Sequence, residues 1–133
     1  MDLVWMLDAP ELPGMSPVEQ RTGVDEFTTF MEAFLADNEG YTEVRPAGSD
    51  YPVLTMGFRQ GLAVVHRFTD EQSVALLRNR NATRGAALFA IPVFHLDHEF
   101  TADFVLPLGE AWAVVKAYVE TGTLPDPGSW TEL

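Results

Sequence analysis

The residues of this chain best suited to binding a metal ion or moving a proton are its three histidines, His66, His95 and His98. His95 and His98 lie three positions apart in the segment HLDHE (95–99), beside two acids. In an extended strand such positions face opposite sides of the sheet, so both rings could reach one metal ion only if the segment turned. The helical HExxH spacing of zinc proteases is absent. We therefore expect no metal centre here, only polar residues at a strand end.

Arg78, Arg80 and Arg84 form the one basic cluster of the sequence, in and beside the polar segment RNATRG (80–85). Together with His95 and His98 they leave open an alternative function, a module that binds a small ligand or a metal. Arginines in a polar loop are more often a solvated edge of the protein than an anion site.

Signatures of catalysis are missing from the sequence. It contains neither a GxSxG serine elbow nor a glycine-rich phosphate loop. Its 20 acidic residues are so numerous that no pair of them indicates a glycosidase. We therefore predict a protein that is not an enzyme and needs no cofactor.

Length and composition set the scale of the fold. The chain has 133 residues, of which 47% are hydrophobic and 11% aromatic, enough for one core in a single domain spanning residues 1–133. It has no cysteine, which excludes disulfides and fits a reducing compartment. The apolar run at residues 3–7 is too short for a signal peptide or a membrane span. We expect a cytoplasmic protein that does not enter membranes.

The negative charge is large and uneven. The net charge is −12; residues 1–50 carry eleven acids against two bases, and residues 91–133 carry seven acids against one base. Residues 51–90 reverse the balance, with five arginines against two acids. Such a surface repels phosphate backbones, so we expect no nucleic-acid binding. It suits a basic protein partner, and solubility is the ordinary alternative explanation.

Hydrophobic spacing of three and four residues predicts a helix that ends near residues 38–40. Its start is indicated at Ser16, by a capping residue followed by Pro17, with an interruption at Gly23. The phenylalanines of the apolar stripe are expected in the core. The stripe consists of Val24, Phe27, Phe30, Met31, Phe34 and Leu35.

Alternating apolar residues predict strands through the middle of the chain. Gly61 supplies the turn of a hairpin over residues 51–69, and Phe100, Phe104 and Leu106 are expected to point inward from a later strand. A second helix should run over residues 106–122, with Pro107 in its first turn and Gly122 after its end. The predicted fold class is α+β: a mostly antiparallel sheet of about five strands, with an N-terminal and a C-terminal helix packed on one side. The predicted strands are residues 3–7, 41–48, the two arms of the 51–69 hairpin, 73–79, 86–94 and 98–106.

The C-terminal segment AYVETGTLPDPGSW (117–130) resembles the ending of an actinobacterial immunity-protein family, the one numbered first among the immunity families of polymorphic toxin systems. The matching residues are Tyr118, Gly122, Pro125 and Trp130. The preceding helix, entered through Leu106–Pro107, and the hairpin around residues 57–61 are also similar. The resemblance covers roughly residues 50 to 131, and the additional Pro127 and Gly128 depart from the family's simpler ending.

Members of that family are encoded beside a secreted toxin, often a nucleic-acid deaminase. The resemblance implies a protein that binds its cognate toxin domain and blocks the active site or the nucleic-acid groove. The expected partner is that toxin domain, and the chain itself is expected to be a monomer or a weak homodimer.

Two sets of residues are singled out within this interpretation. Gly122, Pro125 and Trp130 are predicted to be structural: the glycine ends the helix, the prolines restrict the turn, and the indole fills space between the last helix and the sheet. The predicted toxin contacts are acids on the sheet and its loops, where a rigid frame presents charge at low ordering cost. They are Asp70, Glu71, Asp97, Glu99 and Asp103.

Overall fold

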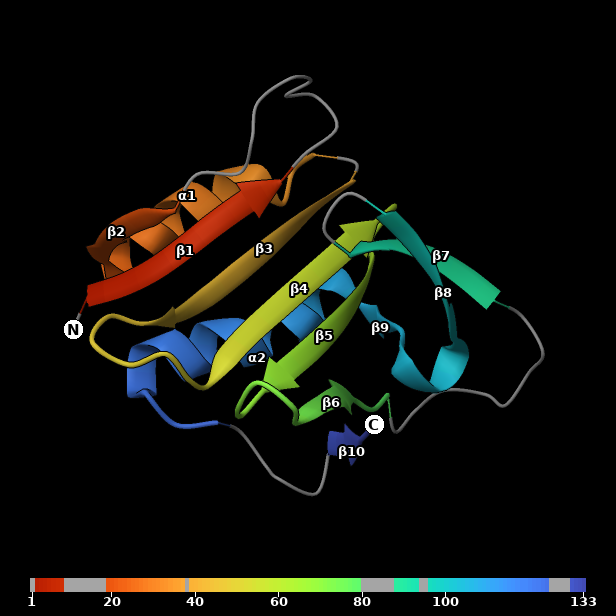
Figure 1. Ribbon diagram of the computed structural model, residues 1–133. Coiled ribbons are helices and arrows are strands. Elements are labelled where there is room, and N and C mark those ends of the chain that lie inside the picture. Colours follow the sequence, from red (N-terminus) through yellow and green to blue (C-terminus); the bar gives the residue numbers. More distant parts are fainter. Residues whose placement is uncertain (1, 9–18, 38, 80–87, 94–95, 125–129) are drawn as a thin grey trace.

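A large antiparallel sheet forms the frame of the protein (Figure 1). The computed structural model describes residues 2–8, 19–37, 39–79, 88–93, 96–124 and 130–133. The strand order is β10-β6-β5-β4-β3-β1-β2, and β9 pairs with β5 beside this path. The strands are β1 (Asp2–Asp8), β2 (Gln20–Gly23), β3 (Glu39–Pro46), β4 (Val53–Arg59), β5 (Leu62–Phe68), β6 (Val74–Leu77), β9 (Leu106–Pro107) and β10 (Trp130–Glu132).

The predicted mixed class and antiparallel sheet are confirmed, but the prediction of about five strands is wrong. Within the described residues the main sheet has eight strands, and β7 and β8 form a separate two-stranded sheet. Three of the additional strands, β2, β9 and β10, contain four residues or fewer. So few residues cannot display a two-residue period, and their pairing depends on partners distant in sequence.

The β4–β5 hairpin is confirmed with its turn at the predicted glycine. Arg59 is paired with Leu62, and the two residues between them, Gln60 and Gly61, have φ of 52° and 80°. Two consecutive left-handed residues match the twist of the flanking strands, and glycine adopts this conformation without steric cost.

Both helices, α1 (Val24–Phe34) and α2 (Leu108–Thr121), pack on one face of the sheet (Figure 1). They are not the terminal elements that the sequence indicates, because β1 and β2 precede α1 and β10 follows α2. Neither helix is long and apolar enough to cross a membrane, and the same holds for every helix in the described ranges. The shared core includes Phe27, Met31 and Phe34 of α1, Val115, Tyr118 and Val119 of α2, and Leu54, Met56 and Phe58 of β4.

The prediction that the first helix runs through residues 20–23 is wrong. Residues 20–23 form β2, which pairs with β1 so that Gln20 lies opposite Trp5. The indole Nε1 of Trp5 donates a hydrogen bond to Thr22 Oγ1 over 3.0 Å. This pairing holds the segment extended until Val24, and Ser16 and Pro17 lie outside the described residues.

The first helix also ends earlier than predicted, at Phe34. Gly40 is not its end but part of β3, beneath the Phe34 ring. A Cβ atom on Gly40 would overlap that ring. The glycine therefore provides room for a core side chain.

The second helix matches its prediction closely. It ends at Thr121, and Gly122 follows with φ of 72° and donates its N–H to the Tyr118 carbonyl over 2.7 Å. Pro107 lies just before the helix, in β9, rather than in its first turn. The predicted strand over 98–106 is divided, because a 3-10 turn (Ala102–Phe104) separates β8 from β9.

The hairpin of β7 (Leu88–Val93) and β8 (Leu96–Thr101) covers part of the opposite face of the main sheet (Figure 1). β7 crosses β4 so closely that a Cβ on Gly57 would overlap the carbonyl oxygen of Pro92. A second core lies beneath this hairpin, distinct from the core under the helices. It contains Val64, Leu76, Ile91 and Val105, with Phe89, Phe100 and Phe104 packed at its margin.

Candidate functional site

The five acids predicted to contact a partner fall into two groups. Asp70 and Glu71 lie in the turn between β5 and β6, whereas Asp97 and Glu99 lie on β8 and Asp103 in the 3-10 turn after it. Figure 1 shows that turn and β8 well apart, so the acids do not form one patch. All are exposed except Asp103, which is half-buried.

Asp70 organises its own turn. Its Oδ1 accepts the backbone N–H groups of Gln72 and Ser73 over 2.8 Å each, and Oδ2 accepts the Ser73 hydroxyl over 3.1 Å. The Gln72 N–H in particular lowers the pKa of Asp70. Such a capped turn is a common structural use of aspartate.

Asp97 also has a structural partner, Arg59 of β4. The guanidinium of Arg59 bonds Asp97 on β8 and Glu39 on β3 over 2.7 Å each, and it donates to the Ala90 carbonyl of β7 over 3.0 Å. The bond to Arg59 lowers the pKa of Asp97, and the two carboxylates raise the pKa of Arg59. One side chain thus ties the β7–β8 hairpin to the sheet.

The histidine and arginine group of the alternative interpretation is only partly described. His98 is exposed on β8 and Arg78 is exposed after β6. His95, Arg80 and Arg84 lie outside the described residues. Within the described part of the chain, no three histidines or acids are arranged to hold a metal ion.

His66 is the histidine with an unusual environment. It lies on β5, partly buried, with its ring 6.2 Å from that of Phe68 and 5.9 Å from that of Phe100. Burial, with a smaller contribution from the charge of His98, lowers the pKa of His66 from 6.5 to about 4. The ring is therefore neutral at pH 7 and acts as part of the packing beneath β8.

We expect acid to destabilise the protein through this ring. The folded state binds the His66 proton more weakly than the unfolded chain, so stability falls as pH drops from 6.5 toward 4. Between pH 7.5 and pH 5 the free energy of unfolding should fall by about 2 kcal/mol.

Urea unfolding at both pH values measures this decrease in the free energy of unfolding. The decrease should be much smaller in His66→Leu, whereas His98→Gln, at the exposed position, should show the same decrease as the wild type. If the free energy of unfolding of His66→Leu falls as much as that of the wild type between the two pH values, other groups cause the pH dependence.

Trp130 is a core residue of the edge strand β10. Its side chain is 9% exposed, it pairs with Leu77 of β6, and it belongs to the core shared with the helices. The guanidinium of Arg67 lies 5.1 Å from the centre of its ring and also bonds the Glu132 carboxylate. Pro125 and Pro127 lie outside the described residues.

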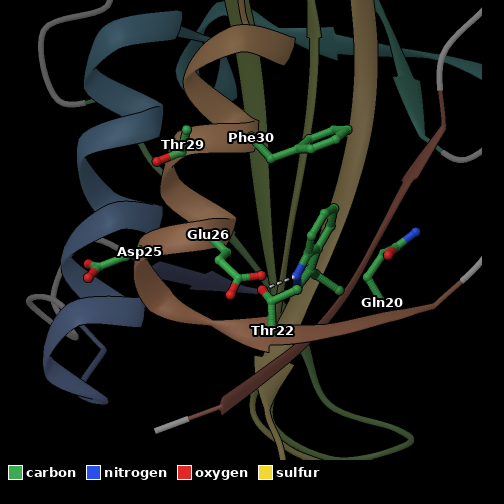
Figure 2. A pocket seen from close by; sticks show the side chains of 7 residues that line it. Gln20, Thr22, Asp25, Glu26, Thr29 and Phe30 are labelled. Atoms are coloured by element: carbon green, nitrogen blue, oxygen red, sulfur yellow. Dashed lines mark hydrogen bonds between the residues drawn. The ribbon is translucent and has the colours of Figure 1, made fainter.

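An open pocket of about 530 Å³ lies between β2 and the first turns of α1 (Figure 2). Two aromatic rings, two carboxylates and three uncharged polar side chains line it. They are Trp5, Phe30, Asp25, Glu26, Gln20, Thr22 and Thr29.

The apolar part of the pocket is a ring pair. The Trp5 and Phe30 centroids lie 5.3 Å apart with their planes tilted by 48°. Phe27, one turn earlier on α1, packs edge-on against Trp5, with ring centroids 5.4 Å apart. The expectation that every phenylalanine of the stripe is buried is wrong for Phe30, which is 52% exposed. Phe30 lies at the margin of the stripe, against the Trp5 ring of β1.

The acidic part of the pocket comes from the start of α1. Glu26 and Phe30 are four positions apart, so they occupy one row of the helix surface. In Figure 2 both project toward the strands, whereas Asp25 points to the far side of α1 from Gln20. Carboxylates in a first helical turn complement the helix dipole, which explains Asp25 and Glu26 but not the exposed ring.

The sequence contains only a weak signal for this pocket. Phe30 is one position of a six-residue stripe, and Trp5 lies in a strand 25 residues away. Their contact depends on β2 bringing α1 alongside β1, and the sequence indicates a helix where β2 lies. Comparison with known proteins adds no identification: no protein-family model matches the chain, and neither does any curated protein.

Proposed function

We propose that this chain is an immunity protein that binds a cognate toxin domain, a nucleic-acid deaminase, and blocks its active site or nucleic-acid groove. It would act in the cytoplasm as a binding protein, without catalysis or a cofactor. The sequence resemblance in residues 117–130 suggests the toxin class. The surface charge carries the argument for a basic protein partner.

The argument from charge depends on whether the lysines and arginines are already paired with acids of the same chain. Most lysines and arginines in the described ranges already bond to acids of the same chain, so little positive charge is left for an anionic ligand. Exposed carboxylates remain on α1, α2, β8 and the β5–β6 turn, among them Glu26, Glu71, Glu99 and Glu120. The internal pairs are Arg21 with Asp2, Arg45 with Glu19, Arg59 with Glu39 and Asp97, Arg67 with Glu132, and Lys116 with Glu32.

A deaminase toxin suits this surface. Such an enzyme holds its nucleic acid in a positive groove and takes the target base into a pocket. An acidic protein can occupy the groove, and opposite fields accelerate the encounter. Neutralising a catalytic toxin inside the producing cell requires a dissociation constant in the nanomolar to picomolar range, about −12 to −16 kcal/mol.

Co-expression tests the proposal. The toxin domain encoded by the adjacent gene would be induced in bacteria with and without this chain, and cell survival and co-purification would be scored. We expect survival only with the chain present and a stable complex on a sizing column. Cell death despite full expression of a folded chain would contradict the proposal.

Two of the predicted contact acids can be tested without disturbing the fold. Asp70 and Asp97 hold local structure, so their substitution would mix folding with binding, whereas Glu71 and Glu99 are exposed. We expect Glu71→Gln, Glu99→Gln to slow association with the toxin domain roughly threefold at low salt, with the difference shrinking as salt rises. Stopped-flow rates at two salt concentrations measure this. Rates equal to wild type at both would exclude these acids from steering.

A further inference from the structure

We propose that the pocket between β2 and α1 receives an arginine side chain of the protein partner. The guanidinium would stack against Phe30 and the edge of Trp5 and form its ion pair with Glu26. This inference rests on the proposed function for the partner, whereas the chemistry of the pocket can be tested without one.

The lining matches an arginine better than other side chains. A guanidinium is planar, stacks on aromatic rings and bonds a carboxylate through two parallel N–H groups. The pocket provides both features: a ring pair with centroids 5.3 Å apart and the Glu26 carboxylate from the same helix row as Phe30. A phosphate or a carboxylate ligand would be repelled by Glu26 and Asp25.

The protein already forms this arrangement once within its own chain. Arg67 lies over the Trp130 ring at 5.1 Å and bonds the carboxylate of Glu132. The pocket presents the same two partners, an aromatic surface and a glutamate. Here the described residues supply no cation between them.

Nearby bases of the chain are directed elsewhere. Arg21 is the base of β2, and it lies opposite Val4, so it faces the other side of the sheet from Trp5 and Thr22. It bonds Asp2 over 3.4 Å. Lys116 of α2 pairs with Glu32, two turns along α1 from the pocket acids. Residues 9–18 contain neither lysine nor arginine.

The exposed ring supports an intermolecular occupant. Phe30 is 52% exposed although Phe27 and Phe34 of the same helix are buried. Partly exposed aromatic residues beside polar groups are typical anchors of protein interfaces. A single arginine side chain from the partner would both cover this ring and neutralise the Glu26 carboxylate.

Arginine binding can be measured on the chain alone. The probe is N-acetyl-arginine amide, titrated into the isotopically labelled protein and followed by two-dimensional NMR, with N-acetyl-citrulline amide as the uncharged isostere. We expect shifts confined to the Trp5 indole N–H and the amides around Thr22, Glu26 and Phe30. Shifts with citrulline should be at least about threefold smaller.

Variants locate the contact. Glu26→Gln and Phe30→Ala should each abolish the localised shifts, whereas Glu120→Gln, an exposed acid on α2, should not. Equal shifts with citrulline, or shifts spread over all acids and unchanged in Glu26→Gln, would overturn the inference. A two-dimensional NMR spectrum that resembles the wild-type spectrum shows that a variant is folded. We expect this result because the Glu26 and Phe30 side chains are exposed.

The same variants in the complex separate this inference from the proposed function. With the toxin domain, Glu26→Gln should weaken binding by about tenfold or more, and Glu120→Gln by less than about twofold. If no complex forms but the NMR shifts appear, the proposed toxin partner fails and the arginine pocket stands. A complex that binds Glu26→Gln as tightly as wild type would overturn the pocket's role as an anchor.

Discussion

Trp130→Ala should lower the free energy of unfolding by about 3–5 kcal/mol, the range for removing a large buried aromatic side chain. Trp130 is 9% exposed and belongs to the core shared by both helices. Its loss also removes the ring on which the Arg67 guanidinium lies, although the ion pair of Arg67 with the exposed Glu132 remains. Urea unfolding at pH 7.5 measures the change.

Leu133→Ala is the matched control for this variant. Leu133 lies three residues further along the same tail and is 70% exposed, so its loss should cost less than about 0.5 kcal/mol. Its backbone N–H bond to the Val74 carbonyl is retained. Equal unfolding curves for Trp130→Ala and wild type would mean that the indole is not part of the core.

Gly57→Ala should also be strongly destabilising, by about 3 kcal/mol, at the upper end of overpacking effects. An added Cβ would overlap the Pro92 carbonyl oxygen, which is rigid backbone rather than a mobile side chain end. Either β7 or β4 must move, and the β7–β8 hairpin has fewer contacts with the main sheet than β4 has with its neighbouring strands. We therefore expect β7 and β8 to separate from the sheet while the core under the helices persists.

Hydrogen exchange distinguishes that outcome from global unfolding. Amides of β7 and β8 should lose protection in Gly57→Ala, whereas those of β3 and β4 should keep most of theirs. Gly109→Ala is the control, because Gly109 lies in the first turn of α2 with open space around its Cβ position. Unchanged stability and protection in Gly57→Ala would show that β7 does not approach β4 so closely.

The parts of the fold that follow from sequence are those with strong local signals. The β4–β5 turn follows from Gly61 between two apolar runs, and the end of α2 follows from Gly122 after a sustained helical stripe. The burial of Trp130 likewise agrees with the prediction from its position after a helix stop and two prolines.

The remainder depends on contacts between distant segments. Gln20–Gly23 becomes a strand only because β1 offers it an edge, and a helix start at Ser16 is the better local interpretation. Gly40 and Gly57 look like turn or breaker residues, yet both lie in strands and make room for Phe34 and Pro92. No local pattern distinguishes these uses of glycine.

The candidate site shows the same division. Exposure of acids such as Glu71 and Glu99 could be expected from composition, but Asp97 is engaged by Arg59, 38 positions away. Phe30 fits the core stripe in sequence, and only the arrangement of β1, β2 and α1 places it beside a cavity. Its exposure could not be predicted without the tertiary structure.

The central claim is that this chain binds a toxin domain tightly enough to neutralise it. Isothermal titration calorimetry of the purified chain against the catalytically active form of the proposed toxin domain tests this most directly. We predict a one-to-one complex with a dissociation constant of about 1 nM or lower, the affinity required for neutralisation. Absence of binding at protein concentrations of roughly 10 µM, well above any neutralising affinity, would contradict the account.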